Sequence, residues 1–142
     1  MMPPAAPSTD TKKRKLRVLL VDDTPSVRQE LHQLLQLTGM IEIVGEAGDG
    51  LQAVRSAADL APDVVVMDLE MPRLDGLEAT RRIKSQGRAP RVVILSVHGG
   101  PENIRRAQDA GADRFVIKGA DFQTLLNTIL GQDGPFYSSE KG

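Results

Sequence analysis

The sequence of 142 residues contains no cysteine, no tryptophan and a single tyrosine. Without cysteine there can be no disulfide bond and no thiolate chemistry, so a bound metal would need oxygen ligands or the two histidines. Oxygen ligands favour hard cations. The chain also lacks an apolar run near the roughly 18 residues of a membrane span, and its first residues do not have the order of a secretory signal. We therefore expect a cytoplasmic protein without a membrane segment.

Charge is nearly balanced, with a formal net charge of -1. This balance favours neither nucleic acid nor an anionic membrane as a partner. The basic run Lys12–Lys15 follows a segment rich in proline, alanine and serine, a composition that buries little surface. We predict a flexible N-terminal tail over residues 1–15, one folded domain over 16–130 and a linker-like tail over 131–142. Direct nucleic-acid binding by this chain is not expected.

Short apolar segments alternate along the folded part with patterns typical of amphipathic helices. The segments that indicate strands are rich in β-branched residues: Val18–Val21, Ile41–Gly45, Val64–Met67, Arg91–Leu95 and Arg114–Ile117. The segments that indicate helices lie between and after them: Pro25–Gly39, Gly50–Leu60, Leu77–Lys84, Pro101–Ala110 and Asp121–Leu130. Five strands alternating with five helices predict a doubly wound α/β fold with a parallel sheet.

Aspartates follow two of the predicted strands at the point where each strand ends. Asp22 and Asp23 come directly after the first strand, and Asp68 after the third. Because the carboxyl ends of parallel strands emerge at one edge of the sheet, we expect the three carboxylates to meet. Unit charges about 4 Å apart interact by roughly 4 kcal/mol at an effective dielectric near 20, so such a cluster needs a cation. The pattern predicts a metal site.

The fourth and fifth predicted strands end in a hydroxyl and an amine, Ser96 and Lys118. Together with the aspartates, these groups suit phosphoryl transfer. A carboxylate can act as the nucleophile, and the transition state spreads negative charge over three oxygens that need neutralising. Mg²⁺ can bridge carboxylates and phosphate, while a lysine ammonium and a serine hydroxyl can donate to further phosphate oxygens.

These residues also carry a resemblance to a known family, the bacterial response-regulator receiver domain, over about Leu16–Leu130. The matching segments are Asp22-Asp23, residues 67–78 (MDLEMPRLDGLE), Leu95–His98 and Phe115–Lys118. The sequence of residues 115–120, followed by Pro135–Ser138, is similar to that of receivers of LuxR-type transcription regulators. The resemblance implies a flavodoxin-like sheet with strand order 2-1-3-4-5, Mg²⁺ as the cofactor, and a histidine kinase as the partner that supplies the phosphoryl group.

The resemblance also implies a role for each matching residue. The implied roles are Asp68 as phosphoacceptor, Asp23 as a direct Mg²⁺ ligand, Asp22 as a ligand through water, the Glu70 backbone carbonyl as a further ligand, Ser96 as switch hydroxyl, Phe115 as switch aromatic and Lys118 as the cation that pairs with phosphate. Movement of the switch residues would make the helices over 101–110 and 121–130, with the strand between them, an output surface.

Two positions depart from the family pattern. Gly119 stands where many receivers have proline, so a cis peptide is not implied there. Phe115 lacks the hydroxyl of a tyrosine, so its switching must be steric. Outside the pattern, His32 and His98 have no cysteine or histidine partner at metal-site spacing and suit the surface. Asp75-Gly76 is typical of a turn and a helix start.

Alternative functions differ from the receiver in what their sites require. An aspartate-dependent phosphohydrolase would need a longer chain and a second acid two residues after the nucleophile, where Glu70 is a loose match. A flavin module would need hydrogen-bond donors to its phosphate in the first strand-helix loop, where Asp22-Asp23 would repel phosphate.

We expect a signalling switch, not an enzyme beyond its own phosphorylation and dephosphorylation. A DNA-binding output domain would need on the order of 60 further residues, so the chain is a fragment of a regulator or a stand-alone receiver, with a homodimer possible.

Overall fold

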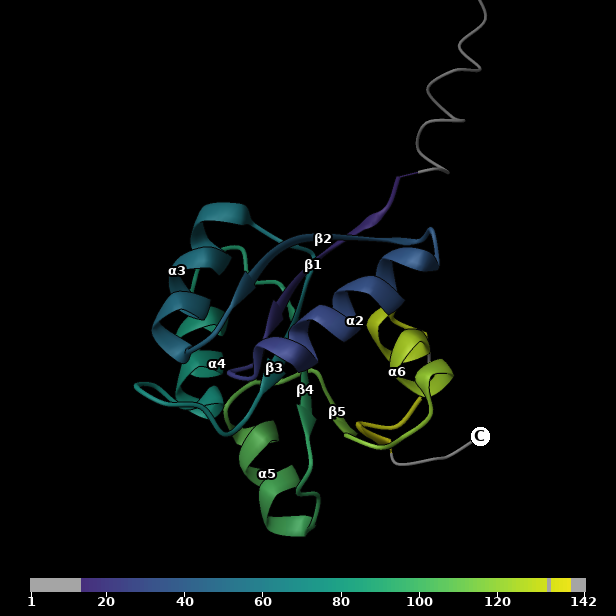
Figure 1. The fold of residues 1–142 in the computed structure, drawn as a ribbon. Coiled ribbons are helices and arrows are strands. Elements are labelled where there is room, and N and C mark those ends of the chain that lie inside the picture. Colours follow the sequence, from purple (N-terminus) through teal and green to yellow (C-terminus); the bar gives the residue numbers. More distant parts are fainter. Residues whose placement is uncertain (1–13, 133, 139–142) are drawn as a thin grey trace, which may run out of the picture.

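The computed structural model describes residues 14–132 and 134–138, which form one parallel sheet between two layers of helices (Figure 1). Neighbouring strands follow the order β2-β1-β3-β4-β5-β6. The strands are β1 (Leu16–Val21), β2 (Ile41–Ala47), β3 (Val64–Asp68), β4 (Arg91–Ser96), β5 (Arg114–Ile117) and β6 (Tyr137–Ser138). The helices are α2 (Pro25–Leu37), α3 (Gly50–Leu60), α4 (Gly76–Lys84), α5 (Pro101–Asp109) and α6 (Phe122–Ile129). None of them is long and apolar enough to cross a membrane.

The predicted fold class and the strand order 2-1-3-4-5 are confirmed. One difference lies in the segment expected to be linker-like. Tyr137 and Ser138 pair in parallel with Phe115 and Val116, which adds a sixth strand to the expected sheet of five. The amide of Phe115 donates to the carbonyl of Phe136 at 2.8 Å. The physical reason is that the aromatic side chains at 136 and 137 pack against the core, which fixes the backbone beside β5. Most of the predicted N-terminal tail, residues 1–13, lies outside the described residues.

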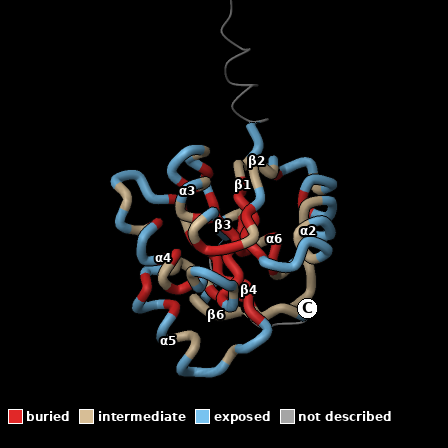
Figure 2. The backbone as a smooth tube through the Cα atoms, turned by 60° about the vertical axis from the view of Figure 1, so that its left-hand side comes forward, coloured by how far each residue is buried: buried red, intermediate tan, exposed pale blue. Residues whose placement is uncertain are grey.

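Side chains alternate along the strands between two apolar layers. Leu19 and Met67 belong to the layer covered by α3, α4 and α5, whereas Val18 and Val66 belong to the layer covered by α2 and α6. Buried segments run along the central strands, and exposed segments lie mainly on the outer helices and loops (Figure 2). Burial on both faces explains why the strand sequences are continuously apolar rather than alternating. It also holds the carboxyl ends of the strands in fixed positions.

Two helices begin where the backbone of another segment passes very close. A Cβ atom built on Gly76 would lie 2.1 Å from the carbonyl oxygen of Asp68, and one built on Gly50 would lie 2.0 Å from that of Leu74. Asp75, as predicted, begins a helix, because its side chain accepts a hydrogen bond from the Glu78 amide at 2.9 Å. The loop after β3 is therefore fixed from both sides.

Candidate functional site

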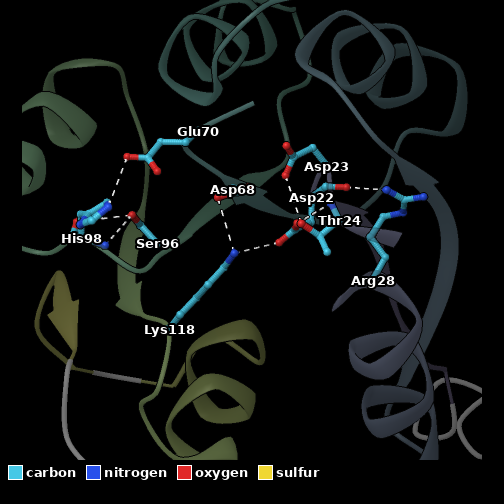
Figure 3. A network of polar contacts seen from close by, with 9 residues as sticks. All are labelled: Asp22, Asp23, Thr24, Arg28, Asp68, Glu70, Ser96, His98 and Lys118. Atoms are coloured by element: carbon cyan, nitrogen blue, oxygen red, sulfur yellow. Dashed lines mark hydrogen bonds and ion pairs between the residues drawn. The ribbon is translucent and has the colours of Figure 1, made fainter. Parts of the chain in front are cut away.

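Three aspartates meet at the carboxyl edge of the sheet, as the sequence predicts (Figure 3). The register pairs Val21 with Met67, so the residues that follow on β1 and the last residue of β3 are neighbours. One carboxylate oxygen each from Asp22, Asp23 and Asp68 lies within 4.8 Å of the other two. Asp22 and Asp68 are buried, and Asp23 is exposed. The cluster lies between β1 and β3, where the strand order reverses.

Lys118 reaches this cluster from the end of β5 and lies between two of its carboxylates (Figure 3). Its Nζ donates to Asp22 Oδ2 at 3.0 Å and lies 3.7 Å from Asp68 Oδ1. Burial by itself lowers the lysine pKa, but the hydrogen bond to Asp22 and the charges of the aspartates outweigh it and raise the pKa above its ordinary value. The ammonium is therefore a permanent counter-ion of the acidic cluster.

Asp68 has a strongly shifted acidity. Its pKa is raised from the ordinary 3.8 to about 6, chiefly by burial and further by the neighbouring charges of Asp22 and Asp23. The charge of Lys118 and a backbone hydrogen bond from Glu70 act in the opposite direction without cancelling it. The charged form of Asp68 is therefore disfavoured by folding, and positive charge brought to this carboxylate would be strongly stabilising.

This shift predicts a pH-dependent gain from Asp68→Asn in metal-free protein. Because the folded-state pKa lies above the unfolded one, the stability linked to this group is present below about pH 4 and is lost as the pH rises through about 6. At pH 7 the asparagine variant should be more stable by on the order of 2 kcal/mol, and the gain should shrink toward zero at about pH 4. Urea unfolding in EDTA measures both values. A gain that does not depend on pH would contradict the assigned shift.

Ser96 ends β4 and is almost completely buried, with 1% exposure. Its hydroxyl turns toward the loop that follows: Oγ accepts from the His98 amide at 3.1 Å and donates to the His98 carbonyl at 3.3 Å. The His98 side chain is exposed, as predicted, and its Nε2 lies 3.9 Å from a Glu70 carboxylate oxygen. The structure thus ties the hydroxyl to the β4–α5 loop, because both of its hydrogen bonds within the described residues are to the His98 backbone and none is to an aspartate.

Phe115 is fully buried, at 0% exposure, and lies two residues before the end of β5. It belongs to the layer between the sheet and helices α3 to α5. The ring of Tyr137 meets it edge-on, with ring centroids 5.7 Å apart and an interplanar angle of 61°. Tyr137 of β6 therefore covers the Phe115 ring, and any switching movement of Phe115 would change this contact.

Sequence reasoning missed the residues that hold the β1–α2 loop. The Arg28 side chain donates to the Asp22 backbone carbonyl and, through Nε, to Glu46 Oε1 at 3.0 Å (Figure 3). His32 binds the other Glu46 oxygen at 2.7 Å and, with Arg28, lowers the pKa of Glu46. The Thr24 amide donates to Asp22 Oδ1 at 2.9 Å. The available signal was an arginine one turn into the helix, but a sequence does not show where its long side chain points.

The fold and the site together define a class of protein. An acidic cluster with one partly buried lysine and one hydroxyl, all at the carboxyl edge of a doubly wound parallel sheet, suits phosphoryl transfer to a carboxylate. The family model of the response regulator receiver domain matches residues 18–130. The chain therefore belongs to the response-regulator receiver family of two-component systems.

Individual relatives support this assignment. A nitrate/nitrite response regulator protein homolog from Haemophilus influenzae is 36% identical over 115 residues, which cover 81% of this chain and 55% of that protein. A protein-glutamate methylesterase/protein-glutamine glutaminase from Myxococcus xanthus is 44% identical over 104 residues, covering 72% of this chain and 30% of that protein. The crystal structure of a LuxR-family two-component response regulator from Aurantimonas is 34% identical, with a TM-score of 0.77, and the match covers 87% of this chain and 91% of that one. The chain spans about half or less of the length of these curated relatives.

Proposed function

We propose that Asp68 is the phosphoacceptor of this receiver and that a histidine kinase supplies the phosphoryl group. A carboxylate oxygen of Asp68 attacks phosphorus, the bond from phosphorus to the donor imidazole nitrogen breaks, and the donor leaves with that electron pair. The product is an aspartyl phosphate. The observation that carries the proposal is the position of Asp68, beside two further carboxylates and 3.7 Å from the Lys118 ammonium. Asp22 beside Asp68 argues against the flavin alternative, because these carboxylates would repel its phosphate. The phosphohydrolase alternative would need Glu70 as a second acid at the site, but the Glu70 side chain is exposed and faces His98.

Mg²⁺ suits the donor set of the site. Receivers generally bind this ion at an acidic pocket, and here three carboxylates offer oxygens within 4.8 Å of one another. Mg²⁺ prefers one or two carboxylates and retains several waters. Asp22 is already held by Lys118 and the Thr24 amide, which supports direct binding by Asp23 and Asp68 and a water-mediated contact by Asp22. The Glu70 carbonyl is proposed as a further ligand. When bound, the ion would neutralise charge on the phosphoryl oxygens.

The remaining site residues would act on the product. Lys118 is close enough to Asp68 to pair with a phosphoryl oxygen after a small movement away from Asp22. Ser96 would exchange its bond to the His98 backbone for a bond to another phosphoryl oxygen. That exchange would move the β4–α5 loop, and Phe115 is the proposed aromatic partner of the movement. A phosphoryl group adds about -1.5 to -2 charge, so both new contacts would be charge-assisted.

Intact-mass measurement after incubation with acetyl phosphate and Mg²⁺ tests the proposal. The wild type should gain one base-labile phosphoryl mass, and Asp68→Asn should gain none, because the amide keeps the shape but lacks the nucleophilic oxygen. Asp75→Asn is a matched control, since the same chemical change there preserves the helix cap and leaves the cluster intact. A base-labile phosphoryl mass on Asp68→Asn would refute the assignment.

Arg28 should affect cation binding without touching the ion. Its side chain joins the Asp22 backbone to Glu46 and thereby holds the loop that carries Asp22 and Asp23. Loss of residues that orient metal ligands typically weakens binding 10- to 100-fold, so we expect Mg²⁺ to bind Arg28→Ala roughly tenfold more weakly. Titration calorimetry measures this, with Arg55→Ala as a control at an exposed position of α3. Equal affinity in both variants would show that the β1–α2 loop keeps its conformation without Arg28.

The output is proposed from the relatives. The resemblance to LuxR-type receivers favours a place in a cytoplasmic transcription regulator whose DNA-binding part lies outside this chain, and no catalysis beyond its own phosphorylation. The methylesterase relative shows that similar receivers also accompany other kinds of output. With a net charge of -1, the chain by itself should not recognise DNA. A gel shift that depended on DNA sequence and resisted salt would contradict this expectation.

A further inference from the structure

Tyr137 lies at a junction between the switch aromatic and the loop that follows Ser96. Its ring packs edge-on against Phe115, and its strand is held to β5 by the hydrogen bond from the Phe115 amide to the Phe136 carbonyl. A Cβ atom built on Gly99 would lie only 3.0 Å from the Tyr137 hydroxyl oxygen and 3.1 Å from Ile117 Cδ1. Glycine at position 99 therefore makes room for the tyrosine.

The other side of this junction leads back to the aspartates. Gly99 belongs to the loop over 97–100, whose His98 backbone is bound by the Ser96 hydroxyl. The loop backbone is also held by the Asn103 side-chain amide, which donates to the His98 carbonyl at 3.1 Å. One continuous set of contacts thus runs from Ser96, through His98 and Gly99, to Tyr137 and Phe115. In Figure 1, the C-terminal segment that carries β6 lies beside β5, between α5 and α6.

We propose that Tyr137 is a positioning residue for the switch, which holds Phe115 and the β4–α5 loop in the unphosphorylated arrangement and is released with β6 when Asp68 is phosphorylated. The inference rests on the proposed function, because it requires Asp68 to be the phosphoacceptor. It goes beyond that function in assigning the C-terminal strand as the element that reports phosphorylation to the chain beyond residue 138.

The direction of the coupling follows from the contacts. A phosphoryl group that draws Ser96 toward Asp68 breaks the two bonds between its hydroxyl and His98, which leaves the Asn103 side chain as the remaining side-chain tie of the loop and lets the loop shift away from the tyrosine. Movement of Gly99 removes the backbone packed beside the Tyr137 hydroxyl, and movement of Phe115 toward Ser96 removes the aromatic contact with the Tyr137 ring. β6 pairs with β5 through two residues, and its main other anchor is the packing of the aromatic side chains at 136 and 137, which the release of Tyr137 would weaken. Coupling is reciprocal, so weakening the Tyr137 contact must strengthen binding at Asp68.

The composition supplies the first test, because Tyr137 is the only tyrosine and the chain has no tryptophan. Its fluorescence therefore reports on this ring alone. Beryllofluoride with Mg²⁺, standing in for the phosphoryl group on Asp68, should raise acrylamide quenching of Tyr137 toward the value in urea and speed hydrogen exchange of the Phe115 amide. Fluorine NMR of the same sample records whether beryllofluoride has bound. If beryllofluoride binds but the quenching of Tyr137 fluorescence does not change, this inference alone is overturned. If no beryllofluoride binds, the proposed function is refuted.

Variants test the reciprocal effect. An edge-on aromatic contact contributes enough that Tyr137→Ala should bind beryllofluoride about two- to tenfold more tightly than the wild type. Tyr137→Phe retains the ring and should bind as the wild type does. Gly99→Ala crowds the tyrosine and should also bind more tightly, whereas Gly87→Ala, where a Cβ would meet nothing within 4 Å, should not change affinity. Equal or weaker binding by both Tyr137→Ala and Gly99→Ala would show that the strand is not coupled to the site.

Discussion

Asp23→Ala is expected to take up phosphoryl groups from acetyl phosphate on the order of 100-fold more slowly than the wild type at limiting Mg²⁺. Asp22 is held by Lys118 and by the Thr24 amide, and Asp68 is the proposed nucleophile, so Asp23 is the carboxylate best placed to hold the ion. It is exposed, and within the described residues its side chain accepts one hydrogen bond, from the Thr24 hydroxyl at 3.4 Å. Without Asp23, Mg²⁺ would bind more weakly, and the incoming phosphoryl group would lack the cation that neutralises its charge.

The measurement is the rate of mass gain over a Mg²⁺ series. Asp59→Ala, at an exposed position of α3 remote from the cluster, controls for the loss of one negative charge. High Mg²⁺ should restore part of the rate in Asp23→Ala, because the carboxylate of Asp68, the other proposed direct ligand, remains. Identical rates for the two variants at every Mg²⁺ concentration would mean that Asp23 does not hold the ion.

Gly76→Ala is expected to destabilise the protein by about 3 kcal/mol, although the substitution adds one methyl group to a helix. The added Cβ would lie 2.1 Å from the Asp68 carbonyl oxygen and 2.8 Å from the Leu69 Cα, and both are backbone atoms that cannot rotate away. Either α4 or the end of β3 must shift. A shift of β3 would move Asp68 itself, so phosphorylation should fall together with stability.

Urea unfolding measures the loss. Gly87→Ala is the matched control, because its Cβ would meet nothing within 4 Å and the change should stay within about 0.5 kcal/mol of the wild type. If Gly76→Ala were as stable as Gly87→Ala, the close approach of α4 to β3 would be wrong.

The acidic cluster could be predicted from the sequence because a buried parallel strand has a strong signature and an unambiguous end. Once β1 and β3 are recognised, Asp22 and Asp68 must emerge at the same edge, whatever the details of packing. The same reasoning placed Ser96 and Lys118 at that edge. It could not show that the ammonium binds Asp22 more closely than Asp68, because that choice depends on distances of a few tenths of an ångström.

The features that escaped prediction depend on tertiary contacts. β6 has two residues, too few to show any periodicity, and turn formers precede it. Its formation depends on the packing of Tyr137 against the Phe115 ring, which exists only in the folded chain. The hydrogen bond from Arg28 to the Asp22 carbonyl likewise depends on the direction of a side chain, which a hydrophobic pattern does not show.

The ion pair between Asp22 and Lys118 joins residues that are 96 positions apart. Contacts of such long sequence separation form late in folding, because the loop between their ends must close first. A chain emerging from the ribosome has its aspartates long before it has its lysine, and a chain truncated before β5 never acquires one. Such chains would present an acidic cluster without its built-in cation, and so would be poor acceptors. We therefore expect the chain to become competent for the proposed phosphorylation only after β5 has been synthesised and has paired with β4.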